Sequence, residues 1–220
     1  MALKFFAFDP HSLVDDQLRP IQILGIESQM AGKQAKILNA KQLAQLLAYA
    51  STSRYSRRNR VIVLLSVKAG LRAGEIANLT WDMVLDPSGQ VSAAIELRDS
   101  AAKKKSGRTI PLHDDLAAAL APWMIETTRS GPIIRSERGG PMTPISIVNW
   151  FKNAYEHLGF AGCSSHSGRR TFITRAARLV HKAGGSLRDV QLLAGHRSIQ
   201  TTQRYIDGDS DAQRRLVALI

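Results

Sequence analysis

Apolar residues recur at helical spacing through most of the chain. After Asn39, a residue type that favours helix N-caps, they fall at Leu43, Leu46, Leu47 and Ala50. The segment from Arg60 to Ala69 is apolar nearly all round and stops at Gly70, so we expect a buried helix that this glycine ends. The pattern predicts further helices over residues 73–81, 114–125, 145–158, 168–181 and 187–194, and a last amphipathic segment over residues 211–220.

Two segments between these helices favour strands instead. Residues 91–97 and 108–112 have the composition of strands, and Lys105-Ser106-Gly107 between them supplies a turn. The pattern therefore predicts an α+β fold that is mainly α-helical and contains a small antiparallel β-sheet.

The first 38 residues follow neither pattern. Apolar clusters around Phe5 and Ile21 are interrupted by Pro10, Pro20 and Gly25, and no helical or strand period is sustained. We expect residues 1–38 to form an N-terminal arm or extension, and residues 39–220 to form one compact domain.

The charge balance favours a polyanionic partner. Lys and Arg total 30 against 18 Asp and Glu, which gives a net charge of +12 and a pI of about 10.3. Ribosomal and membrane-surface proteins share this signature. Between Cys163 and Tyr205 there are eight Lys or Arg against Asp189 alone, so we expect this part to face nucleic acid. A second basic cluster, expected to contact phosphates or to be simply solvated, comprises Arg54, Arg57, Arg58 and Arg60.

Other classes of protein are disfavoured. The longest apolar run, 61–65, is far shorter than the ~20 residues of a membrane helix. Asp9 and Pro10 interrupt the apolar start before a signal peptide forms. The lone Cys163 cannot form an internal disulfide, which fits a reducing compartment. We expect a cytoplasmic protein with no membrane partner.

Four motifs carry candidate chemistry. They are Gly70-Leu71-Arg72-Ala73-Gly74-Glu75, the basic segment Lys103-Lys104-Lys105, Ser165-His166-Ser167-Gly168-Arg169, and Gly195-His196 followed nine residues later by Tyr205. Their order and spacing resemble the tyrosine recombinase, or phage integrase, family over about residues 39–210. That family carries an arginine in G-L-R-x-x-E, a lysine in a β-hairpin, H-x-x-R, and G-H before a nucleophilic tyrosine.

The resemblance implies a role for each matching position. Arg72 and Arg169 would bind the phosphate, with Glu75 as a supporting acidic companion of Arg72. Lys103, eight residues before Pro111, would be the hairpin lysine, although Lys104 and Lys105 are close alternatives. The remaining catalytic positions implied by the resemblance are His166, His196 and the nucleophile Tyr205.

These residue types suit transesterification at a DNA phosphodiester. A tyrosine phenol has a pKa near 10, so about one in a thousand is ionised at neutral pH and the nucleophile needs cationic neighbours. Two arginines can bind the non-bridging oxygens and stabilise the extra transition-state charge, while a lysine can protonate the leaving 5′-oxygen. The resemblance implies a covalent 3′-phosphotyrosyl intermediate that needs no metal, ATP or other cofactor.

The resemblance also sets expectations about assembly. Most family members carry a helical core-binding domain ahead of the catalytic domain, whereas here about 38 residues stand there, so the chain is similar to short, catalytic-domain-only members or to a truncated integrase. We expect double-stranded DNA as partner, a homotetramer on two DNA sites, association with the bacterial nucleoid, and an accessory DNA-bending protein as a possible partner. The alternatives are a strand-nicking topoisomerase and a non-catalytic DNA-binding regulator or decayed integrase.

Overall fold

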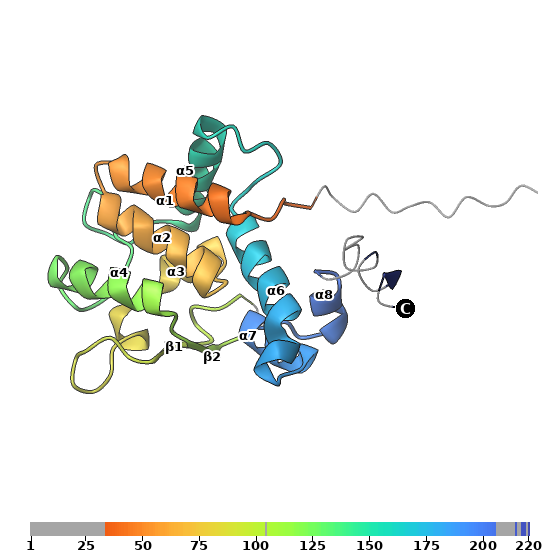
Figure 1. The fold of residues 1–220 in the computed structure, drawn as a ribbon. Coiled ribbons are helices and arrows are strands. Elements are labelled where there is room, and N and C mark those ends of the chain that lie inside the picture. The colour runs from red at the N-terminus through yellow and green to blue at the C-terminus, as the bar shows by residue number, and fades with distance from the viewer. Residues whose placement is uncertain (1–33, 104, 206–213, 215–216, 219) are drawn as a thin grey trace, which may run out of the picture. The chain divides into compact units, whose positions relative to one another are not determined.

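The computed structural model describes residues 34–103, 105–205, 214, 217–218 and 220, which belong to one compact unit from Ala35 onward. They are mainly helical (Figure 1). In chain order the elements are α1 (Ala40–Thr52), α2 (Ser56–Lys68), α3 (Ala73–Asn78), the 3-10 helix η1 (Trp81–Met83), β1 (Ala94–Leu97), β2 (Arg108–Pro111), α4 (Asp114–Ile125), α5 (Pro144–His157), α6 (Ser167–Leu179), the 3-10 helix η2 (Val180–Ala183), α7 (Leu187–Ala194) and α8 (Ile199–Gln203). The predicted fold class, mainly helical with a small antiparallel sheet, is confirmed.

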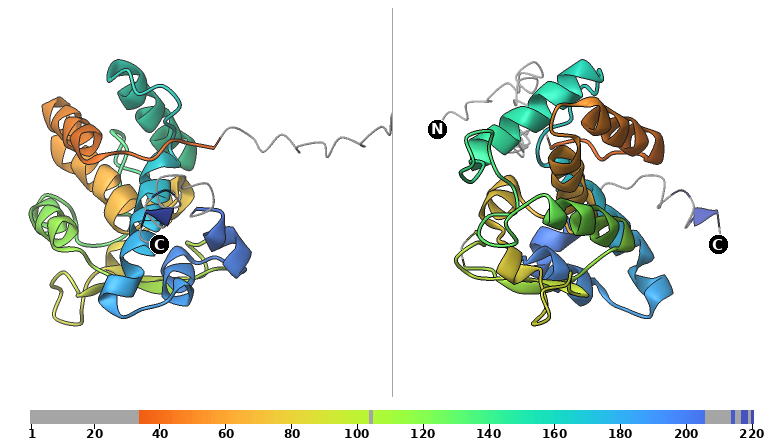
Figure 2. Two further views of the ribbon diagram at one scale, coloured as in Figure 1. Left: turned by 45° about the vertical axis from the view of Figure 1, so that its right-hand side comes forward. Right: turned by 90° about the vertical axis from the view of Figure 1, so that its left-hand side faces the viewer.

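Helix α2 occupies the centre of the main core. Residues 61–65 are fully buried, as the continuous apolar run predicts, and α2 packs against α1, α3, α4 and α6. Helix α1 begins at the predicted cap, where the Asn39 side chain accepts a hydrogen bond from the Gln42 amide at 2.8 Å. Figure 2 shows α1 and α2 side by side, with α5 crossing above them.

The sheet is a two-stranded antiparallel hairpin. Ala94 pairs with Pro111 and Leu97 pairs with Arg108, so residues 98–107 form the connection that carries the basic motif. The strands are shorter than predicted, because Val91 forms an isolated bridge with Leu85 instead of continuing the ladder with β2.

Helices α6, η2 and α7 form a second, smaller apolar cluster. Its buried members are Ile173, Ala177, Val180, Val190 and Ala194. Helix α6 belongs to both parts, since it packs against α2 on one side and α7 on the other, and α7 also contacts β2. This arrangement places α7 in contact with both α6 and the hairpin (Figure 1).

Two predictions fall on residues that the structure does not describe. The arm over residues 1–38 lies almost wholly outside the described part, as does most of the amphipathic segment 211–220. Among the described residues, no helix is long and apolar enough to cross a membrane.

Candidate active site

The first motif forms the start of α3. Arg72 precedes the helix with an extended backbone, and its amide donates to Glu75 Oε2 at 3.0 Å while its Nη1 lies 2.5 Å from Glu75 Oε1. The Glu75 side chain is 1% exposed, whereas that of Arg72 is 22% exposed. Glu75 therefore fixes an arginine that still reaches the surface.

A residue that the motifs did not indicate completes this ion pair. Arg108, the first residue of β2, donates from Nη2 to Glu75 Oε2 at 3.1 Å and from Nη1 to Oε1 at 3.3 Å. Burial alone would raise the pKa of Glu75, but the hydrogen bonds and charge of Arg108, and then those of Arg72, outweigh it and hold this pKa below its ordinary value. Glu75 is thus a carboxylate shared between two guanidinium groups.

Arg169 lies buried in the first turn of α6. Its Nη1 donates to the Gly70 carbonyl and its Nη2 to the Ala194 carbonyl, both at 2.6 Å, and Nη2 lies 3.1 Å from His196 Nε2. Burial and the nearby Arg72 guanidinium lower the pKa of Arg169 to about 10, so it remains a cation at neutral pH. One side chain thereby joins the start of α3, the end of α7 and the second histidine.

The His196 ring is held on both sides. It follows Gly195, which ends α7 in the left-handed conformation, and its Nδ1 lies 3.0 Å from Thr202 Oγ1 at the end of α8. Burial, and then the charges of Arg169, Arg72 and Arg108, lower the pKa of His196 to about 4. The imidazole is therefore neutral at physiological pH.

His166 stands at the N-cap position of α6, one turn before Arg169, as the motif predicts. Its side chain is exposed. Burial of part of the ring, followed by the charges of Arg169, Arg72 and Lys103, lowers the pKa of His166. These surroundings favour the neutral form of the His166 imidazole.

Lys103 and Arg72 line one open cleft of 280 Å³. The full lining is Arg72, Lys103, Ser106, Gly195, His196, Arg197, Ser198 and Thr201. Of the three hairpin lysines, Lys103 is the one in this lining; Lys105 is exposed elsewhere on the turn, and Lys104 is outside the described residues.

Tyr205 follows α8 and packs against the ring of His196. The ring centroids are 5.4 Å apart and the planes differ by 25°. The Arg170 guanidinium lies over the Tyr205 ring, 5.8 Å from its centroid. Tyr205 itself lies outside the cleft lining. Ser198 occupies the N-cap position of α8, but its hydroxyl donates to the Gln200 side chain and forms no capping bond.

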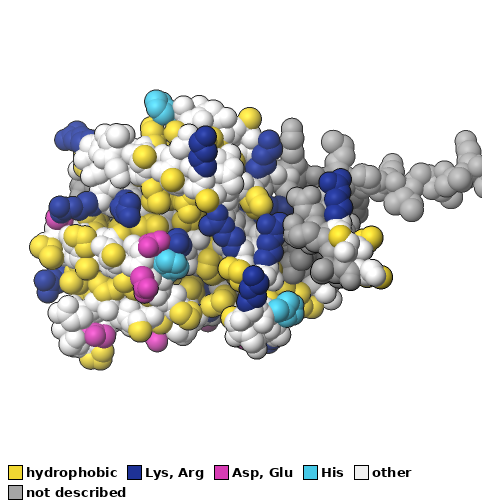
Figure 3. Space-filling model, in the orientation of Figure 1, with side chains coloured by type: hydrophobic (Ala, Val, Ile, Leu, Met, Phe, Trp, Pro, Cys, Tyr) yellow, Lys and Arg dark blue, Asp and Glu magenta, His cyan; other side chains and the backbone are white. Residues whose placement is uncertain are grey.

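The charge around the cleft is predominantly positive. Arg72, Lys103 and Arg197 line it. Arg169 contacts His196 of the lining, and Arg108 contacts Ser106 of the lining. Among the described acidic side chains, Glu75 alone is buried. Figure 3 shows Lys and Arg side chains over α6, while Asp and Glu lie mainly over the α4 side of that face. This is the electrostatic setting of a site for an anion.

The second basic cluster is exposed at Arg54, Arg57 and Arg60, as the sequence suggested, but not at Arg58. Arg58 is 7% exposed, lies over the Tyr55 ring at 4.3 Å and donates to the Arg135 carbonyl at 3.1 Å. Arg57 forms an ion pair with Glu126. Adjacent residues of a helix lie on different faces, so the Arg58 side chain lies on the buried face of α2 while that of Arg57 does not.

Comparison with known proteins gives the family. Residues 36–211, most of the chain, match the sequence model of the phage integrase family. The chain belongs to this family.

Its relatives include the tyrosine recombinase XerC of Brucella suis, which is 28% identical over 155 residues, or 70% of this chain and 47% of that protein. The crystal structure of XerA recombinase superposes with a TM-score of 0.66 at 23% identity, covering 83% of this chain and 64% of that one. The structure of a lambda integrase dimer bound to a COC′ core site has a TM-score of 0.61 at 22% identity. The match covers 80% of this chain and 49% of that one. The chain spans about half the length of the curated relatives it matches.

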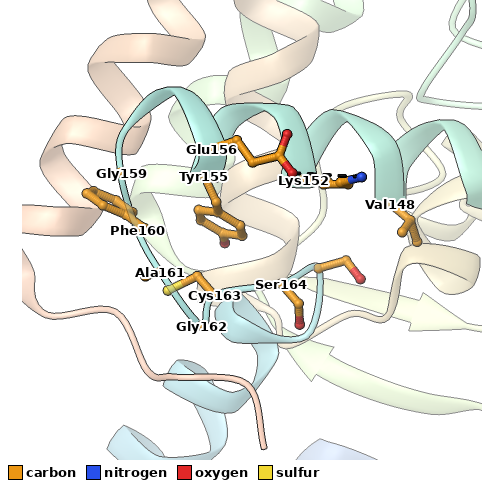
Figure 4. Close-up of a pocket in the computed structure, with 11 residues that line it drawn as sticks. Val148, Lys152, Tyr155, Glu156, Gly159, Phe160, Ala161, Gly162, Cys163 and Ser164 are labelled. Atoms are coloured by element: carbon orange, nitrogen blue, oxygen red, sulfur yellow. Dashed lines mark ion pairs between the residues drawn. The ribbon is translucent and has the colours of Figure 1, made fainter. Parts of the chain in front are cut away.

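This phage integrase family member also has a cavity that is larger than the cleft. It measures 560 Å³ and lies between α5 and the loop that leads to α6 (Figure 4). Its lining includes half-buried Cys163 and buried Tyr155, whose hydroxyl lacks a hydrogen-bond partner among the described residues. Burial raises the pKa of that phenol. None of the predicted site residues lines this cavity, although it reaches Ser165 beside His166.

Proposed function

We propose that the chain is a site-specific DNA recombinase or integrase that cleaves and rejoins DNA through a covalent 3′-phosphotyrosyl intermediate, without metal or ATP. The observation that carries this proposal is the convergence of four separate segments on one cationic cleft. Arg72, Lys103 and His196 line it, Arg169 joins its parts, and Tyr205 stacks on His196.

The arginines bind the scissile phosphate in this proposal. Arg72 is the more exposed of the two and meets the phosphate in the cleft, while the buried Arg169 adds a fixed positive charge that needs no reorganisation during reaction. Their charges favour the transition state, which carries more negative charge on the non-bridging oxygens than the substrate does. Removing one such donor from an active site costs on the order of 100-fold or more in rate.

Proton transfers complete the step. The Tyr205 phenol loses its proton and its oxygen attacks phosphorus, while the bond from phosphorus to the 5′-oxygen breaks and Lys103 protonates the departing oxygen. His166 is a candidate to accept the phenol proton, because its lowered pKa favours the neutral imidazole. Attack by a 5′-hydroxyl reverses the step, so the phosphotyrosine retains the energy for rejoining.

We extend the proposal to domains and partners. Residues 39–220 form the catalytic domain and residues 1–38 the N-terminal arm. Double-stranded DNA is the substrate, which is supported by the positive cleft and by the DNA-bound state of the lambda integrase dimer that shares the fold. We further propose that the chain acts as a homotetramer on two DNA sites, with an accessory DNA-bending protein as a partner. Its proposed location is cytoplasmic and nucleoid-associated.

The test is recovery of covalent protein–DNA adducts under denaturing conditions, followed by sequencing of the attached DNA. Cells would express the wild type, Tyr205→Phe, or the control Tyr49→Phe, whose ring packs against Trp150 and His157 away from the cleft. We expect adducts at a defined sequence from the wild type and Tyr49→Phe, and none from Tyr205→Phe.

Three results would contradict the proposal. Adducts that persist in Tyr205→Phe would exclude Tyr205 as the nucleophile. Specific DNA binding by the wild type without any adduct would favour the alternative, a non-catalytic DNA-binding regulator or decayed integrase. Cleavage and rejoining without exchange between two sites would favour a topoisomerase.

A further inference from the structure

Arg108 has more polar contacts than its place in a short strand requires. Its side chain is 6% exposed. Besides its two bonds to Glu75, Nε donates to the Leu193 carbonyl at 2.8 Å and Nη1 to the Ser106 carbonyl at 3.2 Å. A single buried guanidinium therefore binds three segments that are far apart in the sequence.

Each of these segments carries a residue assigned to the proposed reaction. Ser106 lies in the hairpin turn, and its hydroxyl donates to the Lys103 carbonyl at 2.8 Å. Glu75 binds Arg72. Leu193 belongs to the last turn of α7, two residues before Gly195 and three before His196.

The backbone is shaped to admit this side chain. A Cβ atom built on Gly195 would lie 2.9 Å from Arg108 Nη1 and 3.0 Å from its Cδ. These distances are shorter than ordinary van der Waals contact, so the glycine before His196 leaves the space through which the Arg108 side chain passes.

We propose that Arg108 is a positioning residue that holds the hairpin lysine, the Arg72–Glu75 pair and the end of α7 in one arrangement. The inference deepens the proposed function and rests on it. The planar guanidinium is needed because it can bind a carboxylate through two nitrogens and still direct Nε at a carbonyl, whereas the single nitrogen of a lysine cannot reach all these acceptors together.

The experiment compares two DNA substrates that contain the cleavage site mapped by the adduct sequencing. One has the natural phosphodiester, and the other has sulfur in place of the bridging 5′-oxygen. A thiolate departs without a proton, because thiols are far more acidic than alcohols, so this substrate does not need the hairpin lysine. Single-turnover rates are measured with protein in excess, so that unfolded protein lowers the amplitude rather than the rate.

We expect Arg108→Met to slow cleavage of the natural substrate on the order of 100-fold. With the sulfur substrate the loss shrinks by at least about tenfold but does not vanish, because Arg72 is displaced along with the hairpin. Two variants serve as references. With the sulfur substrate, the cleavage rate of Lys103→Ala should be restored, whereas that of Arg72→Ala should stay low. DNA affinity of Arg108→Met stays close to that of the wild type.

Two further variants separate positioning from folding. Arg108→Lys retains the charge and is expected to show the same substrate dependence if Arg108→Met fails to fold. Arg135→Met is the matched control: Arg135 also donates to backbone carbonyls, those of Ser130 and Pro132, but its loop contributes nothing to the cleft lining. Its cleavage rates should match those of the wild type.

The outcomes distinguish the two proposals. Arg108 variants that cleave at the wild-type rate, or that lose the same factor on both substrates, would overturn the positioning role and leave the proposed function intact. A wild type that forms no adduct would overturn the proposed function and the role of Arg108 with it.

Discussion

The Arg169 guanidinium and the His196 imidazole form a hydrogen bond with 3.1 Å between Nη2 and Nε2. An arginine can only donate, so His196 Nε2 accepts and its proton lies on Nδ1, which donates to Thr202 Oγ1 at 3.0 Å. The pair fixes the tautomer and the orientation of the ring. The face of that ring then supports Tyr205.

The neutral state of His196 predicts how stability depends on pH. Its pKa is about 4 in the folded protein against an ordinary value of 6.5, so between these values the unfolded chain binds the proton first. The free energy of unfolding should therefore be highest above pH 6.5 and fall as the pH decreases toward 4. Burial and the charges of Arg169, Arg72 and Arg108 lower the pKa of His196. The charge of Glu75 acts in the opposite direction.

Urea unfolding of the wild type and His196→Gln over this pH range measures the effect. The glutamine variant should show a flatter pH dependence, because it removes the titrating ring. Replacement of the exposed His181 by glutamine is the control and should retain the wild-type slope. Equal slopes for the wild type and His196→Gln would show that His196 is not held neutral by its neighbours.

Gly195 should be intolerant of a side chain for two reasons that can be separated. Gly195 and Gly184 both have left-handed backbones, with φ of 61° and 70°, but a Cβ on Gly184 meets nothing within 4 Å. Both alanine variants should lose about 1 kcal/mol of stability from backbone strain. Gly195→Ala also presses on Arg108, and it alone should lose cleavage activity.

Circular dichroism of thermal unfolding and the cleavage assay on the mapped site check this pair. If Gly184→Ala loses as much cleavage as Gly195→Ala, general loss of stability explains both variants. The contact between Gly195 and Arg108 would then have no functional role.

Helix α6 approaches α2 closely at Gly168. A Cβ on Gly168 would lie 2.9 Å from Ser66 Cβ and 3.0 Å from Val67 Cγ1, in a fully packed interior. Gly168→Ala should therefore cost about 1–3 kcal/mol in the free energy of unfolding. Adding Ser66→Gly should recover part of that cost, because the two substitutions share the same space.

Gly74→Ala is the control for this prediction. It lies in α3 and a Cβ there meets nothing within 4 Å, so alanine should stabilise the protein by about 0.5–1 kcal/mol. Urea unfolding distinguishes the two variants by sign. A Gly168→Ala variant as stable as the wild type would show that the helices do not pack this closely.

Local patterns were sufficient for much of the fold. The bounds of α4 and α7 match the prediction, since Asp114 and Leu187 begin apolar periods, and Gly195 ends α7. The segment 73–81 was wrong as one helix: α3 ends at Asn78 because Leu79 takes an extended backbone, and residues 81–83 form a separate 3-10 turn. That break depends on tertiary contacts, such as the bond from the Trp81 amide to the Gly131 carbonyl, which the sequence does not display.

The site shows the same division. Short motifs of fixed spacing were enough to propose Arg72, His166, Arg169 and His196 as candidates. Arg108 was missed because its acceptors come from Glu75, Ser106 and Leu193, so its importance exists only in the folded chain. One feature of the sequence could have indicated Arg108: it is the first residue of the predicted strand 108–112 and directly follows the basic turn.

Mass spectrometry of the purified protein–DNA adduct tests the central claim most directly. After protease and nuclease digestion, the nucleotide should be attached through its 3′-phosphate to the peptide that contains Tyr205. The chain has four tyrosines, so the modified residue can be assigned without ambiguity. Attachment to Tyr49, Tyr55 or Tyr155, to a residue other than tyrosine, or through a 5′-phosphate would contradict the account.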